Sequence, residues 1–262
     1  MIEANRKADA YLRSGDLEGA ARQYREAIRV ARSVEDAEGI ATNAINLSIV
    51  YQRLHRPDDA RASLALLLER SQLVFSNESL AQAALRRAVL ELDERRATSA
   101  GEWLERAAAY CGRGCAVSAA IQNVRGQLAL DAGRPDQAAA SAKAALNASR
   151  SSGDRIETAN ALRLLGACAI RAGDGAAAAT YFGEALGIDR ELAAPRKIYL
   201  DLVGLGRASA LRGDRAAARA FYERARGVSE ADRDTDGSAQ ARALIEALGD
   251  SVQARQPSPG TP

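Results

Sequence analysis

Few residues in this chain could do chemistry by themselves, and two cysteines are the clearest of them. Cys111 and Cys115 flank a glycine-rich turn, CGRGC, which is flexible enough for their sulfur atoms to meet. A disulfide there would close a short loop and indicate an oxidising compartment, whereas two unpaired thiols would fit a cytosolic turn. The sequence leaves both interpretations open. The spacing differs from the Cys-x-x-Cys of redox enzymes, and we expect Cys168 to be a small buried apolar side chain.

The only histidine, His55, does not support a catalytic or metal site. A single imidazole with scattered cysteines gives no cluster with metal-ligand spacing, and it gives no Ser-His-Asp or Cys-His arrangement. His55 falls at an expected turn between helices, where a residue that tolerates positive φ is favoured. We therefore predict a non-catalytic protein with no metal and no cofactor.

The composition predicts an all-α protein. Apolar residues make up 47% of the 262 residues, yet only 4% are aromatic and Ala dominates the rest. A core of such small side chains needs the close backbone approach of packed helices. The 36 basic and 34 acidic residues are interspersed, which argues against a nucleic-acid surface. Every apolar run is shorter than the roughly 18–20 residues of a membrane span, so we expect none.

One phrase recurs through the chain with a nearly constant period, which is typical of a solenoid. RSGDLEGAARQYREAI (13–28) returns as RAGDGAAAATYFGEAL (171–186) and LRGDRAAARAFYERAR (211–226). Aligned on its central Ala, the phrase occurs six times, at steps of 40, 40, 38, 40 and 40 residues. These anchors are Ala20, Ala60, Ala100, Ala138, Ala178 and Ala218.

The columns around the anchor each have a physical reason. Small residues twelve positions before it, such as Gly166 and Gly206, let two helices approach closely. Gly five positions before it suits a left-handed helix end, and an Asp after that Gly suits an N-cap. Each unit is therefore a helical hairpin that buries its apolar face only when hairpins stack. The predicted N-caps are Asp16, Asp174 and Asp214, with Pro57 and Pro135 at the first helical position of two other repeats.

The pattern resembles the tetratricopeptide repeat family over about residues 2–229. Leu165-Gly166 and Leu205-Gly206 match its Leu-Gly pair, and Tyr11 and Tyr51 match the aromatic residue three positions later. The family's Trp column and terminal Pro are missing, and repeat three is degenerate. The resemblance implies a right-handed α-solenoid over residues 1–249. We predict hairpins at about 1–35, 36–75, 76–113, 114–153, 154–193 and 194–230, a polar-faced capping helix at 237–249 closed by Gly249, and a disordered tail at 250–262.

The family lines its concave groove with one stripe of the first helix of each hairpin. Asn, Gln and Arg in that stripe present many donors, which suit peptide backbone or carboxylates. Asn46 and Arg86 match positions of the family's carboxylate clamp, whereas Asn5 and Asp9 depart from it in the first repeat. The predicted groove residues are Asn5, Arg13, Asn46, Arg53, Arg86, Asn123, Gln127, Asn160, Arg163, Arg171 and Arg207.

The resemblance implies an interaction scaffold that binds a segment of another protein, of acidic character, in this groove. Two alternatives are a small-molecule-sensing module of a signalling system and a self-assembling repeat protein, and the sequence does not indicate an oligomeric state. We expect a bacterial periplasmic or cell-envelope protein, a lipoprotein with its leader removed, because of CGRGC and the abrupt start of the repeats. A cytoplasmic scaffold is the alternative.

Overall fold

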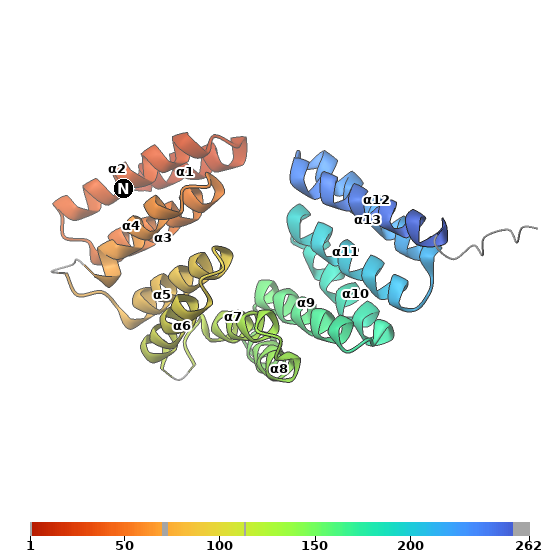
Figure 1. The fold of residues 1–262 in the computed structure, drawn as a ribbon. Helices are drawn as coiled ribbons and strands as arrows, with labels where there is room; N and C mark the ends of the chain where they lie inside the picture. The colour runs from red at the N-terminus through yellow and green to blue at the C-terminus, as the bar shows by residue number, and fades with distance from the viewer. Residues whose placement is uncertain (1, 70–72, 113, 254–262) are drawn as a thin grey trace, which may run out of the picture. The chain divides into compact units, whose positions relative to one another are not determined.

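The protein is all-α, as the sequence predicts. The computed structural model describes residues 2–69, 73–112 and 114–253, with all side chains in these ranges except those of residues 2, 4, 5, 9 and 250–253. These ranges contain thirteen helices and no strand (Figure 1). The helices are α1 (Ile2–Ser14), α2 (Leu17–Ser33), α3 (Ala37–Arg53), α4 (Pro57–Leu68), α5 (Asn77–Asp93), α6 (Ala97–Cys111), α7 (Ser118–Asp131), α8 (Pro135–Ser152), α9 (Arg155–Arg171), α10 (Gly175–Glu191), α11 (Pro195–Leu211), α12 (Arg215–Ala231) and α13 (Thr235–Gln253).

The helix ends follow the predicted column chemistry. Asp16, Asp174 and Asp214 each accept a hydrogen bond from the backbone N–H three residues on, which satisfies one orphan donor of the helix. Pro57 and Pro135 open their helices. The left-handed column is complete across all six repeats: φ is 81° at Gly15, 56° at His55, 58° at Arg95, 73° at Gly133, 76° at Gly173 and 80° at Gly213.

The small-residue column lets each aromatic ring pack against a helix backbone. A Cβ added at Gly166 would lie 2.8 Å from the ring of Phe182, and one at Gly206 would fall onto the ring of Tyr222. All six anchor alanines are buried, with at most 1% of their surface exposed. In these two hairpins the close packing of the helices is therefore built from one Gly facing one ring.

The chain forms two compact units, residues 1–128 and 129–262, with the division inside α7. In unit 1 successive helices from α1 to α6 pack on one another, and α3 also contacts α5. In unit 2 successive helices from α8 to α13 pack in the same way, and α9 also contacts α11. Each unit has its own apolar core, centred on residues such as Leu64 and Leu104 in unit 1 and Leu162 and Leu202 in unit 2. A single superhelix over residues 1–249 stays a prediction.

The last helix is longer than predicted. α13 begins at Thr235 and continues through Gly249 to Gln253, so the expectation that Gly249 closes it is wrong. Gly249 is outside the left-handed region, because Gly permits a helix end without requiring one. Arg242 and Glu246 are exposed on α13, as expected of a terminal helix. The rest of the predicted disordered tail, 254–262, lies outside the described residues.

Candidate functional site

We use the name inner stripe for the predicted groove residues on the first helix of each hairpin. In unit 1 the stripe runs over α1, α3, α5 and the part of α7 up to residue 128. Arg13, Arg53 and Gln127 are exposed, Asn46 and Arg86 are half-buried, and Asn123 is buried. The side chain of Asn5 lies outside the described part of the chain.

Arg86 on α5 is the unusual member of the stripe in unit 1. Its Nε and Nη2 atoms are buried, and neither has a hydrogen-bond partner among the described residues. Burial lowers the pKa of the Arg86 guanidinium below its usual value, while the charge of Asp93 acts in the opposite direction. Buried donors are nearly always paired, because an unmade hydrogen bond costs about 1–3 kcal/mol. Arg86 is thus a cation with unused donors.

The neighbouring arginines of unit 1 are committed to a buried carboxylate. Glu91, on α5, is 2% exposed. Arg61 and Arg87 donate to its Oε1 over 3.2 and 2.6 Å, and Arg96 donates to its Oε2 over 2.6 Å. Glu91 stands where Tyr11 and Tyr51 stand in the first two repeats. At this position, repeat three therefore departs from the first two repeats because an ion cluster replaces an aromatic side chain.

In unit 2 the stripe residue Arg163, on α9, is paired inside the protein. Its Nε donates to Oδ1 of Asp201 on α11 over 2.8 Å, and its Nη2 pairs with Oδ2 of Asp189 on α10. Its Nη1 donates to Oδ1 of Asn160 over 2.9 Å, and Lys197 Nζ donates to the same oxygen over 3.2 Å. Arg163 therefore links three helices, and its donors are in use.

Asp189, Asp201 and Lys197 were missed at the sequence level. Asp189 stands eleven residues after its anchor, where Ala31, Ser149 and Ser229 stand in other repeats. An acidic residue at a repeat position that otherwise holds small residues was the only sequence feature that could have indicated a buried carboxylate. The sequence around Asp201 gave no such indication, because only the stacking of α11 on α9 brings Asp201 to Arg163.

Burial controls the ionisation of this cluster. Burial and the nearby Asp189 raise the pKa of Asp201 to about 7, against the opposing effect of Arg163. Burial, and then the like charge of Arg163, lower the pKa of Lys197. Asp201 is fully buried, and its Oδ2 has no hydrogen-bond partner among the described residues.

The remaining stripe residues of unit 2 face solvent. Arg171 and Arg207 are exposed and form no ion pair with the described side chains. Leu200 and Leu211, on the same helix as Arg207, are 39% and 48% exposed. This part of the stripe thus offers cations beside exposed apolar side chains.

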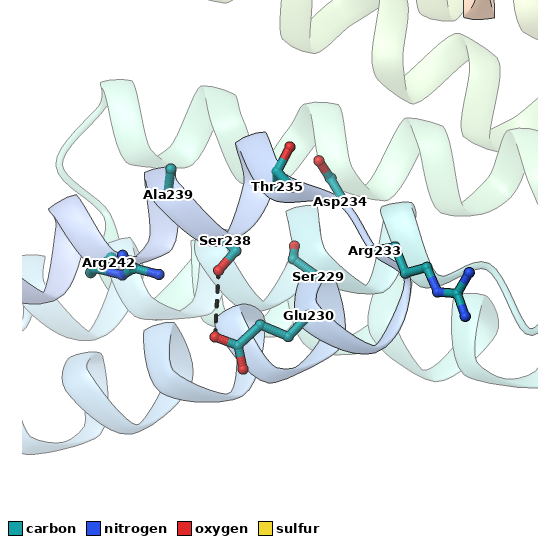
Figure 2. A pocket seen from close by; sticks show the side chains of 8 residues that line it. All are labelled: Ser229, Glu230, Arg233, Asp234, Thr235, Ser238, Ala239 and Arg242. Atoms are coloured by element: carbon teal, nitrogen blue, oxygen red, sulfur yellow. Dashed lines mark hydrogen bonds between the residues drawn. The ribbon is translucent and has the colours of Figure 1, made fainter.

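A pocket of about 400 Å³, lined mainly by polar and charged residues, opens where α12 meets the start of α13 (Figure 2). Ser238 Oγ donates to Glu230 Oε1 over 3.5 Å, and Arg233 and Arg242 lie toward opposite ends of the pocket (Figure 2). Its lining includes acidic and basic side chains, and Ala239 is its only apolar residue. The lining residues are Ser229, Glu230, Arg233, Asp234, Thr235, Ser238, Ala239 and Arg242.

The structure also places the cysteines and the histidine that were singled out from the sequence. Cys111 and Cys115 lie in disulfide geometry, with Cα atoms 5.3 Å apart, and Cys168 is buried. His55 occupies its turn with a φ of 56°. Within the described ranges no group of His, Cys, Asp or Glu could hold a metal ion. None of the described helices is both long and apolar enough to cross a membrane.

Stacked helical hairpins with a stripe of polar side chains on their first helices define an α-solenoid repeat protein. A sequence profile of the tetratricopeptide repeat matches residues 1–72 and 117–191, and the chain belongs to the tetratricopeptide repeat family. No curated protein matches its sequence.

Solved structures share the fold at low sequence identity. BtubC from P. vanneervenii is 17% identical, with a TM-score of 0.62 over 94% of this chain and 96% of its own. A Rap protein complexed with competence and sporulation factor is 13% identical, with a TM-score of 0.68 over 96% of this chain and 73% of its own. PilF from Pseudomonas aeruginosa is 18% identical, with a TM-score of 0.56 over 84% of this chain and 100% of its own.

Proposed function

We propose that the protein is a non-catalytic scaffold whose inner stripe binds a segment of another protein that carries carboxylates and apolar side chains. The main support for this proposal is the contrast between two arginines of the stripe. Arg163 is neutralised by two aspartates, whereas Arg86 has two buried donor atoms without partners. Both atoms are shielded from solvent, so a partner carboxylate would contact Arg86 once its side chain turns outward, and this contact would supply the hydrogen bonds that the guanidinium lacks.

Unit 2 favours the same class of partner. Arg171 and Arg207 are exposed cations of the stripe, and Leu200 and Leu211 are exposed apolar side chains on the same helix as Arg207. A partner with alternating acidic and apolar residues would contact both kinds. The fold is that of a protein-interaction scaffold, and one similar structure is a Rap protein complexed with competence and sporulation factor.

The test of Arg86 combines stability with binding. Arg86→Met keeps the length of the side chain and removes the unsatisfied charge, so we expect a melting temperature higher by a few degrees. The same change removes a charge-assisted contact of about 1.5–3 kcal/mol, so a fluorescent peptide rich in Glu and Leu should bind about ten-fold more weakly or worse.

The matched control is Arg25→Met on α2, an exposed arginine of a second helix in the same unit. We expect it to leave both measurements unchanged. A stable Arg86→Met protein that binds the peptide as tightly as the parent would remove Arg86 from the binding surface. A loss of melting temperature would instead make Arg86 a structural residue.

We also propose an oxidising compartment such as the bacterial periplasm. The support is the proximity of Cys111 and Cys115, which lie at the end of α6 and in the turn that follows. Alkylation of protein taken directly from its source cell, with and without prior reduction, should show two additional modified thiols only after reduction. Full alkylation of both without reductant would place the protein in a reducing compartment.

A further inference from the structure

Two buried carboxylates share one guanidinium in unit 2. Asp201 is completely buried and Asp189 is 3% exposed, and both pair with Arg163, which is itself mostly buried. The three residues come from α11, α10 and α9, so the cluster joins three consecutive helices. We call these three residues the carboxylate cluster.

The charges around the cluster do not balance locally when both carboxylates are ionised. Arg163 supplies one positive charge for two negative ones. Lys197, the other cation, donates to Asn160 and faces Asp189 and Asp201 as well as Glu157 of α9, so two cations face three carboxylates. Tyr199 on α11 and Tyr222 on α12 have pKa values raised by burial and stay neutral near pH 7. One buried oxygen, Oδ2 of Asp201, is left without a donor.

A single proton on the two carboxyl groups would reduce the charge imbalance and would also give the unpaired Oδ2 of Asp201 a role. Bound between Asp189 and Asp201, it removes the repulsion between like charges, and the cluster becomes neutral overall with Arg163. A buried carboxyl such as that of Asp201, with a second carboxylate beside it, keeps its proton at a pH where isolated carboxyls have lost theirs.

We propose that the carboxylate cluster is a proton-linked switch of unit 2, which packs α11 on α9 and α10 when the shared proton is bound and loosens that packing when the proton leaves. The raised pKa of Asp201, about 7 against the ordinary 3.8, gives the direction. Because the folded state binds the proton more tightly than the unfolded state, the stabilisation is complete below about pH 4 and is lost as the pH rises through about 7.

The switch would act on the surface that we propose for binding. α11 carries Leu200 and Arg207, so looser packing of α11 changes how these side chains are presented. This consequence rests on the proposed function. The proton linkage itself needs no ligand, and it can be tested on the full chain alone.

The first experiment follows the melting temperature of the full chain between pH 5.5 and pH 8.5, for the parent and for Asp201→Asn. Asn mimics the protonated carboxyl in shape and charge. We expect the melting temperature of the parent to fall by about 5 °C relative to the variant as the pH rises. The two proteins differ only at residue 201, so the contributions of all other groups cancel in the comparison.

The matched control is Glu91→Gln in unit 1, which neutralises a buried carboxylate that is held by three arginines. It should keep the pH dependence of the parent. An Asp201→Asn protein whose melting temperature varies with pH as the parent's does would overturn the switch. If Asp201→Asn does not fold, a carbon-13 titration of the Asp201 carboxyl in the parent decides, and an apparent pKa below 5 would overturn it.

Hydrogen exchange locates the effect. At pH 8.5 the amides of α9, α10 and α11 should exchange more slowly in Asp201→Asn than in the parent, and at pH 5.5 the two proteins should agree. Equal exchange at both pH values would overturn the switch while leaving the proposed function intact. Failure of the Glu- and Leu-rich peptide to bind would refute the proposed function and leave the switch unaffected.

Discussion

Each unit buries a charged side chain at the centre of an ion cluster on the first helix of a hairpin, but this central charge is negative in unit 1 and positive in unit 2. Unit 1 surrounds one carboxylate, Glu91, with three arginines, and unit 2 places one guanidinium, Arg163, between two carboxylates. In unit 1 a second carboxylate, Glu94, also pairs with Arg61 and Arg96, so those cations have alternative partners. In unit 2 both carboxylates depend on the same guanidinium.

The comparison shows that the position of an arginine on the stripe does not decide whether it can bind a partner. Arg86 and Arg163 occupy adjacent positions of the repeat, fourteen and fifteen residues before their anchors. Arg163 meets an aspartate on each of two neighbouring helices, whereas Arg86 keeps unpaired donors. The neighbouring helices decide which arginine is paired inside the protein and which keeps unused donors.

The largest expected effect comes from removing Arg163. Arg163→Met removes the guanidinium that pairs with both buried carboxylates and leaves them only the charge of Lys197, and loss of one partner from a buried ion pair costs about 3–5 kcal/mol. Chemical denaturation near pH 7.5 should show a loss of that size, and a smaller loss at pH 5.5, where the carboxylate cluster holds its proton more fully.

Glu91→Gln in unit 1 sharpens the contrast. Arg96 is 45% exposed and can pair with Glu94, so part of the uncompensated charge is solvated or paired again. We expect a smaller destabilisation than for Arg163→Met. Equal losses in the two units would contradict the view that unit 2 lacks alternative partners.

Much of the fold could be predicted from the sequence because it depends on local rules. A left-handed residue, an Asp cap or a Gly that faces a ring is specified within one repeat, and the left-handed residue recurs in all six repeats at the nearly constant period. The partners of Arg163 could not be predicted. Asp189 and Asp201 lie 26 and 38 residues away, and only the stacking of three helices brings their carboxylates to one guanidinium. Similarly, no spacing rule shows that Arg86 lacks partners.

An intermediate effect is expected at the closest helix contact of unit 2. Gly206→Ala would place a methyl group on the ring of Tyr222, and such overpacking typically costs about 1–3 kcal/mol. Gly183→Ala and Gly227→Ala are matched controls, because an added Cβ at either meets no atom within 4 Å. They should raise stability by up to about 1 kcal/mol through helix propensity. Thermal melts that show stabilisation by Gly206→Ala would argue against the ring packing.

The smallest effect on stability, with a clear effect on binding, is expected from the two exposed arginines of the stripe in unit 2. Arg171→Glu combined with Arg207→Glu changes solvated side chains, so the unfolding free energy should change by no more than about 0.5 kcal/mol for each, with the helical CD spectrum intact. The Glu- and Leu-rich peptide should bind roughly ten-fold more weakly at low salt. Because screening weakens contacts between exposed charges, the difference should shrink as salt is added.

Arg190→Glu on α10 is the control for this charge reversal, because Arg190 is equally exposed but lies on the second helix of its hairpin. If the control weakens peptide binding as much as the double variant does, the attraction comes from net charge alone and the stripe is not a specific surface. Arg163 is excluded from this set because its guanidinium is held by Asp189 and Asp201. Reversing its charge would unfold unit 2 before it could report on binding, so only Arg171 and Arg207 separate recognition from stability in this unit.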